Sequence, residues 1–95
     1  MRITPDRPLL DDIESIPVPA RDKLDMGVYL KYSRHSSPFS MNHPAASLIT
    51  SRGCPHDCVF CSTKNMWRRR WRANSPQKVL KEIECLVSDY GVKEI

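Results

Sequence analysis

Apolar side chains recur at the spacing of one helical face in the last third of the chain. The recurring apolar positions are Val79, Leu80, Ile83, Leu86, Val87 and Tyr90. Ser75 offers a side-chain oxygen that can cap free N–H groups, and the ring of Pro76 suits the first helical position. Gly91 follows the last apolar position and tolerates the left-handed backbone that ends many helices. The pattern therefore predicts an amphipathic helix between Ser75 and Gly91.

Two short segments on either side of this helix have the pattern of strands. Residues 46–51 place β-formers at the centre of a short run, which Arg52 and Gly53 close. Residues 92–95 alternate apolar and polar side chains, as an opening strand does. Strand, loop, helix and strand in this order predict an α/β fold built on a parallel βαβ unit with a right-handed crossover. Such a unit leaves both sheet edges unpaired, so we expect the chain to be cut short.

The first 45 residues predict a different kind of structure, because prolines interrupt them. These prolines are Pro5, Pro8, Pro17, Pro19, Pro38 and Pro44. Each removes a backbone donor and pushes the preceding residue toward extended geometry. One or two helical turns fit between Arg21 and Met26, ended near Gly27. We therefore predict an irregular connector over residues 1–45 and a regular domain over residues 46–95.

Composition and charge narrow the class of protein further. The chain has 95 residues, 27% of them charged and 40% hydrophobic, which is typical of a soluble, partly globular protein. It has neither an apolar run of about 18 residues nor a signal peptide, so we expect no membrane span and a cytoplasmic location. The excess of positive charge lies in residues 46–95, which hold nine basic and five acidic residues. Cytoplasmic thiols stay reduced, so clustered cysteines there indicate metal binding or catalysis.

Three of the four cysteines form such a cluster. Cys54, Cys58 and Cys61 have the spacing C-x3-C-x2-C in a loop that follows the first predicted strand. Thiolates are soft ligands that suit zinc and iron–sulfur clusters. Because a fully ligated cube uses four cysteines, three would leave one iron open to bind a substrate or cosubstrate directly.

A fourth ligand from elsewhere in the chain is disfavoured. Cys85 falls nearly opposite the apolar face of the predicted helix, so we expect it to be an exposed, redox-sensitive thiol. His56 lies inside the loop and is the other candidate, although a solvent-facing histidine is the simpler interpretation.

At the cysteine loop the sequence resembles the radical S-adenosylmethionine superfamily. The segment Cys54-Pro55-His56-Asp57-Cys58-Val59-Phe60-Cys61 is similar to its signature loop. The resemblance implies that Cys54, Cys58 and Cys61 ligate a 4Fe-4S cluster, whose open iron chelates S-adenosylmethionine, and that Phe60 lies beside the adenine. Reductive cleavage would then yield a 5'-deoxyadenosyl radical that takes hydrogen from an unidentified small-molecule substrate, with an electron donor such as a flavodoxin or ferredoxin.

Segments outside the loop extend this resemblance. Residues 11–21 look like the connector between a cobalamin-binding domain and the radical domain of one subgroup, which implies possible cobalamin use in the full-length relative. The segment from Met66 to Pro76 is similar to the same subgroup, which often has glycine where this chain has Arg68. The family's domain is a partial (β/α)6 barrel, of which this chain resembles the first quarter. We therefore expect the chain alone to be truncated, inactive and marginally folded.

A basic, tryptophan-containing run follows the cysteine loop. It contains Lys64, Trp67, Arg68, Arg69, Arg70, Trp71 and Arg72. The favoured interpretation is a solvated loop, or a loop that covers the barrel's edge with arginine stems packed on tryptophan. Contact with an anionic substrate or cofactor tail and binding of nucleic acid are the alternatives, the latter disfavoured. Two other functions compete with the enzyme: a zinc-binding nucleic-acid module and a small iron–sulfur electron carrier.

Overall fold

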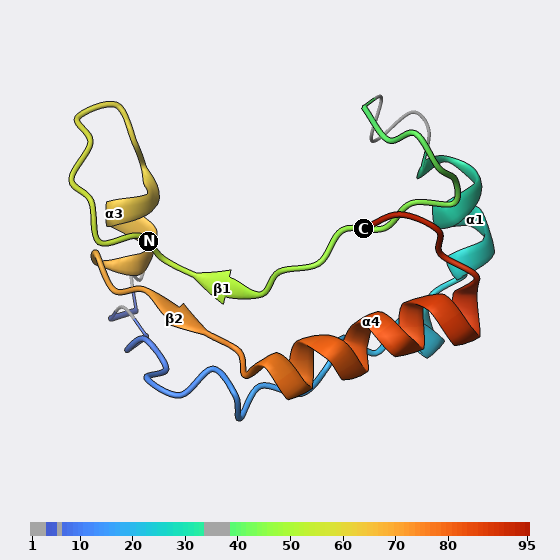
Figure 1. Ribbon diagram of the computed structural model, residues 1–95. Coiled ribbons are helices and arrows are strands. Elements are labelled where there is room, and N and C mark those ends of the chain that lie inside the picture. The colour runs from blue at the N-terminus through green and yellow to red at the C-terminus, as the bar shows by residue number, and fades with distance from the viewer. Residues whose placement is uncertain (1–3, 6, 34–38) are drawn as a thin grey trace.

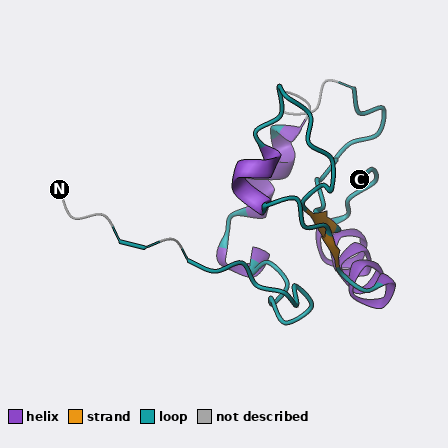
Figure 2. Ribbon diagram, turned by 90° about the vertical axis from the view of Figure 1, so that its left-hand side faces the viewer, coloured by secondary structure: helices purple, strands orange, loops and turns teal. Residues whose placement is uncertain are grey.

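The computed structural model describes residues 4–5, 7–33 and 39–95; Pro38 and residues 34–37 lie outside the described residues. In chain order its elements are η1 (Arg21–Lys23), α1 (Met26–Lys31), β1 (Ser51–Arg52), α3 (Thr63–Trp67), β2 (Arg72–Ala73) and α4 (Pro76–Tyr90). The longest element is α4, which follows β2 and runs along the bottom of the view in Figure 1. Loops make up most of the remainder (Figure 2). None of the helices in the described ranges is long and apolar enough to cross a membrane.

Helix α4 confirms the prediction made from its apolar spacing. The Ser75 side chain accepts a hydrogen bond from the backbone N–H of Lys78 at 3.2 Å, and Pro76 opens the first turn. Gly91 ends the helix in the left-handed conformation, with φ of 63°. Leu86 is fully buried and Glu82 is 7% exposed, so the buried face includes a carboxylate that needs a partner.

The predicted strands form only in part. Residues 46–50 belong to no strand, and β1 is limited to Ser51–Arg52, which pairs with β2 in antiparallel register. The predicted parallel pairing is reduced to one bridge between Ala45 and Glu94, with the Ala46 N–H donating to the Glu94 carbonyl at 3.0 Å. The described residues are therefore α/β, but their two-stranded sheet is antiparallel and no barrel is formed. A ladder needs a partner strand along its length, and residues 47–49 have no backbone hydrogen bond to another segment of the described structure.

The predicted connector is irregular and packs along α4. Arg21 Nη2 lies 2.6 Å from Glu82 Oε1, with side chains 15% and 8% exposed, so the buried carboxylate of α4 is paired. Lys78 Nζ donates to the carbonyls of Ile13 and Ile16 at 3.2 and 2.5 Å. Ile13 is 4% exposed and joins Leu86 among the buried apolar residues. The connector is thus held by polar contacts and by burial of an apolar side chain.

One helical turn forms within residues 21–26 as predicted, but a second helix follows it. η1 occupies Arg21–Lys23, and α1 begins at Met26, passes through Gly27 and ends at Lys31. The expected stop near Gly27 is wrong, because the Asp25 side chain accepts the Val28 N–H at 3.3 Å and caps a new helix there.

Candidate cluster-binding loop

The cysteine loop begins where β1 ends, at a glycine that no other residue can replace without strain. Gly53 has φ of 91°, and a Cβ built on it would lie 1.8 Å from the Arg70 carbonyl oxygen. The backbone after α3 therefore presses directly on the backbone before Cys54. This close approach fixes the base of the loop between β1 and the segment that leads to β2.

The three loop cysteines are free thiols with different exposure. Cys54 and Cys61 are half-buried and Cys58 is exposed. The Cys61 N–H donates to the Cys58 carbonyl at 3.1 Å and closes a turn between them. Hydrogen bonds from the side chain and the backbone of Thr63 lower the pKa of Cys61, since they favour the thiolate. Thr63 is the first residue of α3, so this helix places hydrogen-bond donors beside the last cysteine.

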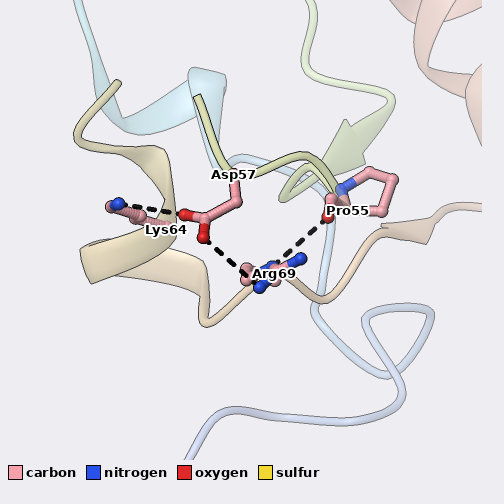
Figure 3. A network of polar contacts seen from close by, with 4 residues as sticks. All are labelled: Pro55, Asp57, Lys64 and Arg69. Atoms are coloured by element: carbon pink, nitrogen blue, oxygen red, sulfur yellow. Dashed lines mark hydrogen bonds and ion pairs between the residues drawn. The ribbon is translucent and has the colours of Figure 1, made fainter. Parts of the chain in front are cut away.

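One carboxylate holds the loop against the basic segment. Lys64 Nζ lies 2.9 Å from Asp57 Oδ1, and Arg69 Nη1 lies 3.5 Å from Asp57 Oδ2 (Figure 3). Arg69 Nε also donates to the Pro55 carbonyl at 3.4 Å. Sequence reasoning missed this network, although Asp57 is the only acidic residue between Asp25 and Glu82. A lone acid next to a basic run was the available signal.

The other predicted site residues lie in or near the loop without forming a closed site. Phe60 is 90% exposed, and His56 is exposed. Among the described residues, no three histidine, cysteine or acidic side chains are grouped closely enough to hold a metal ion. The donor set nevertheless fits a soft metal centre, because it offers three unoxidised thiols within eight residues. Residues 55–60 are all exposed, so little packing opposes their closing around a bound group.

Cys85 lies on a different part of the molecule. It belongs to the C-terminal half of α4, which lies on the opposite side of the molecule from the cysteine loop (Figure 1). Its Sγ donates to Asp89 Oδ2 at 3.2 Å, and this bond, followed by burial, raises the pKa of Cys85. The thiol is half-buried rather than exposed as expected. Its position leaves three cysteines in the loop.

The basic run is more structured than a covering loop. Residues Thr63–Trp67 form α3, and Arg68 ends it with φ of 52°, a left-handed conformation that favours glycine. The guanidinium carbons of Arg52 and Arg72 lie 5.8 and 5.7 Å from the centroid of the Trp67 ring. The predicted stacking of arginine on tryptophan is thus present, and its centre is Trp67.

The curated relatives of this chain include proteins named as methyltransferases and as a methylase. An uncharacterised methyltransferase of Pyrococcus horikoshii is 40% identical over the whole chain, which spans 19% of that protein. The cytidylyl-2-hydroxyethylphosphonate methyltransferase of Streptomyces wedmorensis is 34% identical over 87% of the chain and 16% of its own length. The hopanoid C-3 methylase of Methylococcus capsulatus is 36% identical over 70% of the chain and 12% of its own length.

These relatives decide the family. The chain belongs to the radical S-adenosylmethionine superfamily. It spans about a fifth or less of the radical S-adenosylmethionine enzymes named above. No family model matches the chain, and no solved structure does. The match to the Pyrococcus protein covers all 95 residues and therefore includes the cysteine loop of this radical S-adenosylmethionine chain.

Proposed function

We propose that this chain is the cluster-binding part of a radical S-adenosylmethionine enzyme. The observation that carries the proposal is the set of three free cysteines on a loop whose base is fixed by the contact between Gly53 and Arg70. Similarity to named methyltransferases over the length of the chain supports the same assignment. The loop thus combines soft ligands with a fixed attachment to the fold.

In this proposal Cys54, Cys58 and Cys61 hold three irons of a 4Fe-4S cluster. When bound, the cluster would supply an open iron for S-adenosylmethionine and the electron for its reductive cleavage to methionine and a 5'-deoxyadenosyl radical. Thr63 donates hydrogen bonds that favour the thiolate of Cys61. Phe60, which is 90% exposed, would lie beside the adenine and keep water away.

The activity of the whole protein is proposed from its relatives. The three relatives named above carry methyltransferase or methylase in their names, so methyl transfer to a small molecule is the reaction we assign. The connector's resemblance to a cobalamin-linked subgroup makes cobalamin the proposed second cofactor. A flavodoxin or ferredoxin would deliver the electron. We place the protein in the cytoplasm, where the cysteines remain available as thiols.

Anaerobic reconstitution of the chain with iron and sulfide tests the assignment of the three ligands. We expect a brown protein with broad visible absorption and about four irons per chain. Cys54→Ala, Cys58→Ala and Cys61→Ala should each lose most of the iron and colour, because each removes one of three ligands. Cys85→Ala is the matched control and should reconstitute like the parent, since Cys85 lies outside the loop.

Two results would contradict the proposal. A colourless chain that binds one zinc would favour a zinc-binding module. Loss of the cluster in Cys85→Ala would give the cluster a fourth cysteine and favour an electron carrier.

A further inference from the structure

Two arginines face each other across the short sheet. In the antiparallel register Arg52 lies directly opposite Arg72, so both side chains emerge on the same face. Both guanidinium groups also lie against the ring of Trp67. Like charges directly opposite each other destabilise a strand pair. This arrangement therefore has an electrostatic cost that a bound anion would remove.

Arg72 has donors that the described structure leaves without acceptors. Its Nη1 donates to the carbonyl of Leu10 in the connector. Its Nε and Nη2 atoms are buried and have no hydrogen-bond partner in the described parts of the chain. A buried cationic donor without an acceptor is costly, and two donors on one guanidinium match the two oxygens of a phosphate or carboxylate. The unused edge of Arg72 thus has the geometry of an anion-binding group.

Arg72 is also one of the residues that line a small cavity. It has a volume of about 220 Å³, and the side chains at its wall include Arg7, Arg52, Trp67 and Arg72. The rest of its lining comes from apolar residues of the connector between positions 8 and 16. No acidic residue is among the described residues that line it. Asp11 pairs instead with Arg70 at 2.6 Å, and Glu14 accepts hydrogen bonds from Ser75.

We propose that this cavity binds the phosphate or phosphonate group of a small ligand. Three arginines, apolar walls and no carboxylate among the described lining residues make a dianion the best-matched occupant, because charge-assisted hydrogen bonds are stronger than neutral ones. The volume is several times the ~30 Å³ share of a water molecule, so it suits one phosphoryl group rather than a whole nucleotide. The site needs no iron–sulfur cluster and stands independently of the proposed function.

A nucleic-acid interface fits the same residues less well. Binding of single strands uses exposed aromatic faces on which successive bases stack. Trp67 is half-buried, and two guanidinium groups already lie against its ring. The three arginines converge on one cavity instead of lining a groove along which a backbone could run.

Tryptophan fluorescence of the full 95-residue chain tests the proposal. In Trp71→Phe the remaining tryptophan is Trp67, which reports directly on the cavity. We expect inorganic phosphate to change its emission saturably, and potassium chloride of equal ionic strength to leave it unchanged. In this background Arg52→Gln and Arg72→Gln should each weaken phosphate binding about tenfold or more, because each removes charged hydrogen-bond donors.

Arg69→Gln is the matched control, because Arg69 pairs with Asp57 outside the cavity. It should bind phosphate like the parent. Arg52→Lys keeps the positive charge but loses the planar guanidinium group, so we expect phosphate affinity between those of the parent and Arg52→Gln. This variant tests the proposal if Arg72→Gln does not fold. An equal response to chloride, equal weakening by Arg69→Gln and Arg52→Gln, or a response to an oligonucleotide but none to phosphate would each overturn the proposal.

Discussion

At the scale of single residues, the cysteine loop depends on a glycine next to its first cysteine. Gly53 combines a left-handed φ with backbone contact to Arg70, so its missing Cβ is a steric requirement of the loop base. Gly91 also has a left-handed φ, but a Cβ there would meet nothing within 4 Å. A substitution at Gly91 would therefore cost only the strain of the left-handed backbone, whereas a substitution at Gly53 would add a steric clash.

Alanine substitutions at these two glycines should differ in size. We expect Gly91→Ala to lower the free energy of unfolding by ~1 kcal/mol, the usual cost of a left-handed backbone for a residue with a Cβ. Gly53→Ala should cost clearly more, because the new methyl group meets the Arg70 carbonyl. Urea unfolding followed by circular dichroism measures both. Equal losses would show that Gly53 does not fix the loop base.

Single residues also mark what the sequence could and could not predict about the site. The cysteine spacing identified the loop, whereas the contacts of Asp57 with the basic run were missed. The only sequence signal for the left-handed backbone at Arg68 was the glycine that is common at this position in the cobalamin-linked subgroup. The pairing of Arg52 with Arg72 depends on strand register across the 19 residues of chain between them, and no local pattern specifies it.

At the scale of elements, α4 was predictable and the strands were not. A helix satisfies its own backbone and needs only a cap, an apolar face and a stop, all of which residues 75–91 carry. A strand depends on partners from distant sequence. The described chain supplies β1 with one short partner and residues 47–49 with none, so the strand pattern there was insufficient.

The connector's attachment to α4 should depend on pH. The backbone N–H and the hydroxyl of Ser75 donate to Glu14, which lowers the pKa of Glu14 below its usual value of 4.5. A carboxyl whose pKa is lowered by folding adds stability above its unfolded pKa and loses it as pH falls through the folded value. We therefore expect stability to fall below pH 4.5. Backbone N–H groups of Asn42 and Met41 lower the pKa of Glu94 similarly, so this carboxyl adds to the fall.

Glu14→Gln should make this acid-range loss smaller, since the variant has one fewer carboxyl to protonate. Thermal unfolding measured between pH 3 and pH 7 checks it, with Glu84→Gln as the control for removing one exposed carboxylate from α4. An unchanged pH profile in Glu14→Gln would show that the contact with Ser75 does not contribute.

At the scale of the whole molecule, a small core supports an extended set of loops. The buried apolar side chains in the described residues are Ile13, Ala45, Leu86 and Val92. Many larger ones are exposed, among them Ile49 at 67% and Leu80 at 57%. Apolar side chains of this kind, beside backbone that has no strand partner, are what a further layer of structure would cover. The chain's match to about a fifth of a longer relative agrees with that arrangement.

The central claim is that the three-cysteine loop holds a 4Fe-4S cluster with one iron open to S-adenosylmethionine. Mössbauer spectroscopy of the chain reconstituted with enriched iron, before and after addition of S-adenosylmethionine, tests this most directly. We predict that about one iron in four changes its parameters toward nitrogen and oxygen ligation while the others remain thiolate-bound. Four irons that stay equivalent after the addition, or the absence of a cluster, would contradict the account.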